Sequence, residues 1–196
     1  MLRYAMTILA ALALTTLPAL ADGQREPVLG DDGLHKAPWM QDTFRVLRED
    51  LEDAEAQGKR LLLMIEQRGC IYCKKMHEEV FVVPEIDRML SEDFYVVQIN
   101  MFGDVEVVDF DGAAMSEKDA VRRWGAMFTP TLMFFPESAE DIPSDATASD
   151  AAIVTMPGAF SASTTRNLLT FVLEKGYETD EPFQKYHARK LEEREG

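Results

Sequence analysis

Apolar residues along the chain follow two kinds of spacing, one typical of strands and one typical of helices. Short continuous or alternating apolar runs predict strands over residues 61–65, 94–101, 131–135 and 153–156. Apolar residues at helical spacing, with their flanking cap and stop residues, predict helices over residues 43–57, 70–79, 84–90, 116–124 and 161–175. Because strands alternate with helices, we expect an α/β fold whose central sheet has helices on both faces. Only a loop joins the last two strands, so we expect them to pair antiparallel.

Residues near the helix starts refine these predictions. Asp42 is expected to cap the first helix, with Phe44 and Leu47 on its core face. Ser116 and Asp119 form a capping-box pattern in which Asp replaces the usual Glu or Gln.

The segments between and outside these elements are polar. We expect residues 22–40 to be an extended lead-in and residues 41–179 to form one domain. Within that domain, residues 103–115 and 136–152 are predicted acidic loops, and the second contains no Lys or Arg. Residues 180–196 form a highly charged tail, in which a few apolar side chains could line one helical face.

Residues 1–21 have the pattern of a signal peptide. Arg3 supplies the positive charge, an uncharged apolar run follows, and the segment ends in Ala19-Leu20-Ala21, which a signal peptidase accepts. The apolar run is short for a membrane span, which needs about 20 residues. We therefore expect cleavage after Ala21 and export to a periplasm, where disulfides persist.

Composition narrows the classes of function. The chain has 196 residues and a net charge of −15. Such acidity disfavours a nucleic-acid binder, which needs a cationic surface. Only two cysteines are present, so a scaffold of several disulfides is excluded.

Those two cysteines, Cys70 and Cys73, form a C-x-x-C motif at a predicted strand-to-helix turn. Positions i and i+3 share one face of a helix, so the two sulfurs can reach disulfide distance. The N-terminus of the helix stabilises a thiolate, and Lys74 and Lys75 add positive charge. We expect Cys70 to be the attacking thiol, since it lies nearer the helix end, and Cys73 to resolve the mixed disulfide. The redox-active disulfide would then need no further cofactor.

Other uses of the motif stay open. The pair could be a structural disulfide, although closing so short a loop stabilises little. It could also bind copper or zinc together with Met76 and His77, although we predict no metal site because a complete ligand set is not evident. Covalent haem attachment is excluded, because Lys74 follows the second cysteine where a His is needed.

A second informative position is Pro130, between Thr129 and a predicted strand. Proline cannot sit in mid-strand, so it marks either the first strand residue or a cis turn.

Together, the C-x-x-C motif, Thr129-Pro130 and the order of elements resemble the thioredoxin superfamily over residues 41–177. The resemblance implies a thioredoxin fold with a central mixed sheet of four to five strands, flanked by helices on both faces. It also implies that Pro130 is a cis-proline facing the motif and that Thr129 contacts the bound substrate. Within the superfamily, the chain resembles periplasmic thioredoxins of the SoxW type, which are linked to bacterial sulfur oxidation. The segments that carry this resemblance are residues 66–77, 100–104, 110–112 and 122–125.

The chain also departs from typical thioredoxins. Gly69 replaces the usual Trp before the first cysteine, and Ile71-Tyr72 replace Gly-Pro. Met64 stands where thioredoxins carry the buried acid that assists proton transfer. Glu66 is a candidate for that role, although we expect it to point to the other face of the strand from position 64.

These features predict a periplasmic thiol–disulfide oxidoreductase that acts as a monomeric reductase. Its expected partners are proteins with disulfides, which Tyr72 would help to contact, and a membrane thiol–disulfide electron donor. A disulfide isomerase, an oxidant, or a copper or zinc carrier that uses the C-x-x-C motif are the alternatives.

Overall fold

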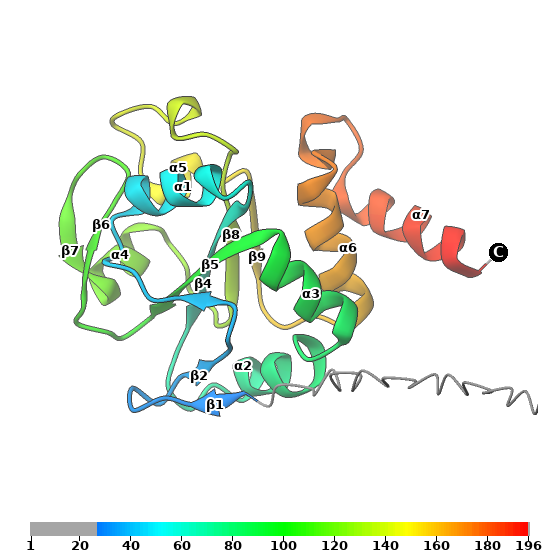
Figure 1. Cartoon of the computed structure of the whole chain (residues 1–196), viewed down its shortest axis with the longest axis horizontal. Coiled ribbons are helices and arrows are strands. Elements are labelled where there is room, and N and C mark those ends of the chain that lie inside the picture. Colours follow the sequence, from blue (N-terminus) through cyan, green and yellow to red (C-terminus); the bar gives the residue numbers. More distant parts are fainter. Residues whose placement is uncertain (1–26, 196) are drawn as a thin grey trace, which may run out of the picture.

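The computed structural model describes residues 27–195 and contains a five-stranded mixed sheet (Figure 1). The strand order is β3–β5–β4–β8–β9. The strand bounds are Met40–Gln41 (β3), Arg60–Glu66 (β4), Phe94–Asn100 (β5), Thr131–Phe134 (β8) and Val154–Pro157 (β9). Strands β3, β5 and β4 run parallel, whereas β8 is antiparallel to β4 and β9 to β8. The predicted mixed sheet and its antiparallel final pair are confirmed.

Helices cover both faces of this sheet. On one face, buried residues of α1 and α4 pack against β4 and β5, and on the other face those of α3 and α6 do so. The bounds are Leu47–Ala56 (α1), Ile71–Lys75 (α2), Pro84–Glu92 (α3), Glu117–Arg123 (α4) and Ala162–Leu173 (α6). A π-helical turn, Met76–Val80, continues α2, so the helix predicted over residues 70–79 has two forms.

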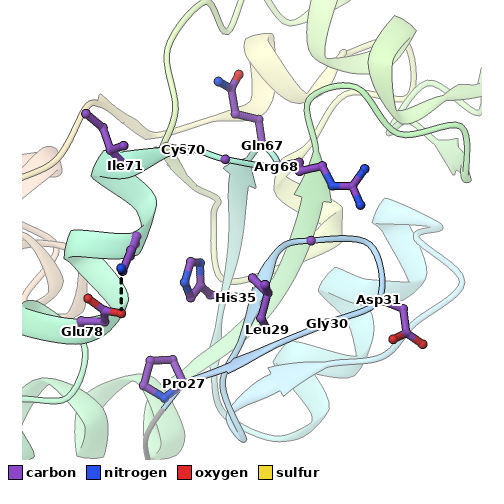
Figure 2. Close-up of a pocket in the computed structure, with 13 residues that line it drawn as sticks. Pro27, Leu29, Gly30, Asp31, His35, Gln67, Arg68, Cys70, Ile71 and Glu78 are labelled. Atoms are coloured by element: carbon purple, nitrogen blue, oxygen red, sulfur yellow. Dashed lines mark ion pairs between the residues drawn. The ribbon is translucent and has the colours of Figure 1, made fainter.

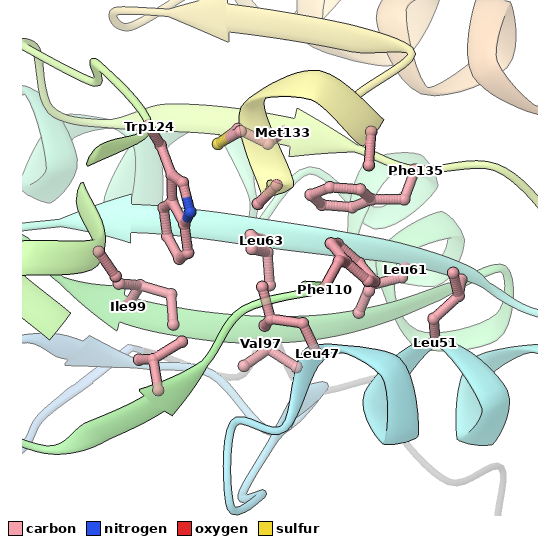
Figure 3. Packing of buried hydrophobic residues seen from close by; sticks show 14 of the residues in the cluster. Leu47, Leu51, Leu61, Leu63, Val97, Ile99, Phe110, Trp124, Met133 and Phe135 are labelled. Carbon is pink, nitrogen blue, oxygen red and sulfur yellow. The ribbon is translucent and has the colours of Figure 1, made fainter. Parts of the chain in front are cut away.

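Strand β4 lies at the centre of both cores. Leu61, Leu63 and Ile65 contribute to the cluster beneath α1 and α4, part of which Figure 3 shows. Leu62 and Met64 contribute to the cluster beneath α3 and α6. All five side chains are completely buried, which explains why this strand reads as a continuous apolar run. The end of this strand, four residues before Cys70, is therefore held in place by packing on both faces.

The first helix begins later than predicted. Phe44 is 93% exposed and Val46, not Asp42, is the N-cap of α1. Arg45 has φ 55°, and Val46 is extended because it bridges to Val108. The core face predicted for Phe44 is therefore wrong, since the tertiary bridge interrupts the helical pattern.

The segment over residues 103–115 is not a simple loop. It holds the hairpin strands Glu106–Val108 (β6) and Ala114–Ser116 (β7). Val107 and Phe110 are buried in the core beneath α1. The apolar residues of this segment form no continuous run, because acidic residues separate them, so the sequence pattern did not indicate the strands.

The second acidic segment, residues 136–152, is also partly ordered. It contains a 3₁₀ turn, Ala139–Asp141, and a short helix, Ala148–Ala151 (α5), which begins with a capping box at Thr147. This segment has no Lys or Arg of its own, but the guanidinium of Arg48 from α1 binds its backbone. This guanidinium donates to four backbone carbonyls at 2.8–3.3 Å, those of Phe110, Ala139, Ile142 and Pro143.

The two ends of the domain are structured as well. The lead-in forms a hairpin from Val28–Leu29 (β1) and His35–Lys36 (β2), and β3 follows as an edge strand of the sheet. After a 3₁₀ turn, Gly176–Glu178, the tail forms α7, Phe183–Glu195, which packs on α6. Tyr186 is 2% exposed and contacts the ring of Phe171.

The predicted signal peptide lies outside the described residues. Within residues 27–195, none of the helices combines the length and apolar character that a membrane span requires. Export therefore stays a prediction from the sequence.

Asp50 of α1 provides a test of the core. Burial raises its pKa from the ordinary 3.8 to about 6. The folded protein thus binds this proton more readily than the unfolded chain, and stability should fall as pH rises from about 4 to about 6. Asp50→Asn should increase the free energy of unfolding by up to about 3 kcal/mol at about pH 7, with little change at about pH 4. Urea denaturation across this range measures it.

The matched control is Glu55→Gln on the exposed side of the same helix. It should leave the pH dependence of the wild type unchanged. An Asp50→Asn protein no more stable than wild type at about pH 7 would contradict the prediction.

Candidate active site

The two cysteines lie where β4 leaves the sheet and α2 begins. Cys70 and Cys73 form a disulfide, with their Cα atoms 5.2 Å apart. Gly69, directly before the motif, has φ 71°, a left-handed conformation that favours glycine. This turn geometry accounts for glycine at the place where thioredoxins usually have Trp.

The sulfur of Cys70 is surrounded by polar groups. As the N-cap of α2, it accepts a hydrogen bond from the backbone N–H of Cys73 at 3.0 Å. The hydroxyl of Thr129 donates to the same sulfur at 3.4 Å, and the Thr129 carbonyl oxygen lies 3.5 Å from it. Donors of this kind favour the thiolate form of a cysteine. Cys70 is also the more exposed of the pair, at 9% against 2% for Cys73.

The loop that supplies Thr129 faces the motif, and the peptide bond between Thr129 and Pro130 is cis. The expected cis turn is therefore present. The N–H of Gly158 donates to the Pro130 carbonyl at 2.7 Å, and the Thr131 hydroxyl donates to that of Phe128 at 2.7 Å. These bonds hold the loop at the start of β8, against Cys70.

Exposed apolar side chains border the disulfide. Tyr72 is 59% exposed and Ile71 73%, both on α2. Across the motif, next to Thr129, Met127 is 78% exposed and Phe128 60%. We call these four residues the apolar rim. Exposed apolar groups of this size that gather at one place are typical of a surface that contacts another protein.

Glu66 ends β4 and is 1% exposed. The expectation that it points away from the face of Met64 is wrong, because residues two apart on a strand share a face. Its carboxylate contacts His77, whose ring packs against Trp39 and Phe81 on that same side of the sheet.

Glu66 belongs to a buried polar cluster that the sequence did not reveal. Its two carboxylate oxygens lie 3.0 and 3.1 Å from Nε2 of His77. The side-chain amide of Gln98, from β5, donates to Glu66 at 2.6 Å, and Lys36 donates to the Gln98 oxygen at 2.6 Å. These residues come from four separate elements, so no local pattern could indicate them. The sequence had singled out Glu66 for proton transfer and His77 only as a possible metal ligand, and nothing in it joined the two.

Aromatic rings enclose His77. It stacks with His35 at 5.2 Å and with Trp39 at 6.3 Å between ring centroids, and the ring of Phe81 meets it edge-on. Its Nδ1 atom is buried and has no hydrogen-bond partner among the described residues. Burial, and then the charge of His77, lower the pKa of His35.

A pocket of about 650 Å³ lies between this turn and the β1–β2 hairpin (Figure 2). Cys70, Ile71 and Arg68 form one side, and His35 and Leu29 form the hairpin side. The half-buried ring of His35 thus separates His77 from the open pocket.

The charges near the motif are largely balanced. Lys74 and Lys75, expected to add positive charge, lie 3.7 and 3.8 Å from Glu78 and Glu79. These pairs are exposed, so each contributes little. The positive environment of Cys70 therefore comes from backbone and hydroxyl donors.

The residues that the alternative of a metal carrier would use make other contacts. His77 is bonded to Glu66, and the sulfur of Met76 accepts from the N–H of Phe160 at 3.3 Å. In the part of the chain that the structure describes, no group of three or more His, Cys, Asp or Glu side chains is placed to hold a metal ion.

Known proteins show the same fold. A profile of the thioredoxin-like domain matches residues 47–171, more than half of the chain. The curated proteins contain no match. A solved thioredoxin-fold protein from Helicobacter pylori is 19% identical, with a TM-score of 0.51, covering 69% of this chain and 86% of its own.

Two further solved structures match with lower TM-scores. A thioredoxin from Thermus thermophilus is 21% identical, with a TM-score of 0.49, covering 67% of this chain and 86% of its own. A DsbH oxidoreductase is 14% identical, with a TM-score of 0.38, covering 66% and 86%.

A C-x-x-C disulfide at the start of a helix, opposite a cis-proline loop, defines a thiol–disulfide oxidoreductase. The chain belongs to the thioredoxin-like family. Oxidoreductases of this family act on protein disulfides.

Thr129→Val tests the hydroxyl contact with Cys70. The change keeps the side-chain shape but removes a hydrogen bond to the sulfur, worth about 0.5–1.5 kcal/mol. The rate at which iodoacetamide alkylates reduced Cys70 at fixed pH should fall about two- to tenfold. An unchanged rate would show that this hydroxyl does not stabilise the thiolate.

Proposed function

We propose that the protein is a periplasmic thioredoxin-like reductase of protein disulfides. The observation that carries the proposal is the setting of the Cys70 sulfur. It accepts a hydrogen bond at the start of α2, contacts Thr129 of the cis-proline loop, and lies within the apolar rim.

The reaction follows from the chemistry of thiol–disulfide exchange. The Cys70 thiolate attacks one sulfur of a substrate disulfide, and the substrate's other sulfur leaves as a thiolate and takes a proton. Cys73 then attacks the Cys70 sulfur of this mixed disulfide. The Cys70–Cys73 disulfide forms, and the second substrate thiol is released. Two electrons thereby pass to the substrate, and a donor must return them.

Substrate binding would use the surfaces on both sides of Cys70. The backbone of Thr129 and Pro130 offers hydrogen-bonding groups to an extended substrate segment, as in β-strand addition. Tyr72 and the rest of the apolar rim would bury apolar side chains of the partner. The protein would act as a monomer, since the rim must stay open.

The location and the electron donor rest on the sequence. The signal-peptide pattern of residues 1–21 supports export. Reduction in an oxidising periplasm requires imported electrons, which supports a membrane thiol–disulfide donor. The motifs similar to SoxW-type thioredoxins support a role in sulfur oxidation. Genes for sulfur oxidation beside this one would strengthen that assignment.

Glu66 would take part in the proton transfer of the second step. It is the acid on the same strand face as Met64, and it lies in a buried polar cluster just behind the motif.

Two alternatives are separable by measurement. A reduction potential near about −270 mV, that of thioredoxin, supports a reductase, whereas one near about −120 mV supports an oxidant. Anaerobic titration with copper or zinc tests the carrier. The bond between His77 and Glu66 argues against His77 as a ligand, so we expect no stoichiometric binding.

Replacement of each cysteine distinguishes their roles. Cys70→Ser should abolish reduction of insulin disulfides by added dithiothreitol, because the attacking thiol is lost. Cys73→Ser should accumulate mixed disulfides with partners, visible on non-reducing gels. Activity of Cys70→Ser at the wild-type rate would overturn the proposed function.

The apolar rim is tested at Met127 and Phe128. Met127→Ser with Phe128→Ser should raise the KM for insulin several-fold, because apolar contact with the protein substrate is lost. Reduction of a small neutral disulfide should stay at the wild-type rate. Phe44→Ser, on an exposed side chain before α1, is the control and should change neither.

A further inference from the structure

We propose that His77 accepts the proton of the Cys73 thiol, and that Glu66 acts through His77 as a positioning residue. The inference rests on the proposed function and assigns to His77 the second step of that reaction. Along the chain, His77 lies four residues after Cys73, whereas Glu66 lies seven residues before it.

His77 lies on the same helical segment as Cys73. Helix α2 passes without a break into the π-helical turn that carries His77, four residues further on. Residues four apart on a helix are neighbours on its surface. Both side chains face the protein interior, since Cys73 is 2% and His77 1% exposed.

One nitrogen of His77 is available for a proton. Both oxygens of Glu66 contact Nε2, so Nε2 carries the hydrogen that Glu66 accepts. In the neutral ring Nδ1 then has a lone pair. This atom is buried and has no hydrogen-bond partner among the described residues, which is unusual for a buried polar atom.

The groups around His77 stabilise a positive charge on its imidazole ring. Glu66 lies against Nε2, and Gln98 fixes the carboxylate from β5. The ring of His35 stacks on one side, and burial, followed by the charge that His77 carries once protonated, lowers the pKa of His35. The other charged groups near these rings are Lys36, which bonds Gln98, Asp87, which bonds Trp39, and the pair Lys74 and Glu78.

Proton transfer from Cys73 to His77 precedes the attack of Cys73 on the mixed disulfide. The Cys73 S–H bond breaks and its proton moves to Nδ1 of His77, leaving a Cys73 thiolate beside an imidazolium paired with Glu66. The thiolate attacks the Cys70 sulfur, and the bond between Cys70 and the substrate sulfur breaks. The substrate leaves as a thiolate and takes a proton from water, and the imidazolium of His77 returns its proton to water. A local acceptor matters here because a buried thiol ionises unfavourably by itself.

The experiment separates the two steps. The reduced protein is mixed with 5,5′-dithiobis(2-nitrobenzoate) in a stopped-flow instrument. Attack by Cys70 releases one coloured thiolate, and attack by Cys73 on the mixed disulfide releases a second. The first phase reports Cys70 and the second phase reports Cys73.

His77→Gln keeps an amide donor for Glu66 but cannot accept the proton. We expect the second phase to slow about 100-fold, in the usual range for loss of a general base. Its rate should also rise more steeply with pH than in the wild type, while the first phase stays unchanged. His187→Gln is the control, since that ring lies on α7 against Phe183, Asn167 and Thr164, and it should change neither phase.

An unchanged second phase in folded His77→Gln, or equal slowing of both phases, would overturn the inference. If circular dichroism shows that this variant does not fold, Glu66→Gln takes its place, with a slower second phase and an altered pH profile expected. A wild-type profile in Glu66→Gln would then overturn it. Absence of the first phase in the wild type would instead overturn the proposed function.

Discussion

The burial of β4 on both faces is the constraint on which the rest of the structure depends. Its side chains alternate between the two cores, and the strand bonds to β5 and β8 on its two edges. Because neither face nor edge can shift, the residues at its end are fixed. Glu66 is thereby held inside the protein and Cys70 at its surface, only four residues apart.

The active site forms where three segments meet at that end of the sheet. The turn into α2 brings Cys70, the loop before β8 brings Thr129, and the β1–β2 hairpin brings His35 to the pocket behind the motif. The lead-in is therefore part of the site, and it also supplies Lys36 to the buried cluster. The disulfide and the buried polar cluster behind it are therefore held by the same end of the sheet.

The net negative charge of the chain does not set the environment of the Cys70 sulfur. Most acidic side chains of the two segments around α4 are used in local structure. Asp109 accepts from the Trp124 ring and the Ala148 N–H, and Asp104 and Asp111 pair with Lys118 and Arg123. These contacts organise segments that composition alone described as loops, and they leave backbone and hydroxyl donors to set the environment of Cys70.

The sequence by itself determined four strands of the central sheet, most helices, the C-x-x-C pair and the importance of Pro130, because each depends on residues close together in the chain. Tertiary structure decided the rest. Phe44 followed a helical pattern but lies in solvent, since a long-range bridge delays the helix. The cluster of Glu66, His77 and Gln98 joins three elements, and a buried polar group is satisfied only by partners that folding brings to it.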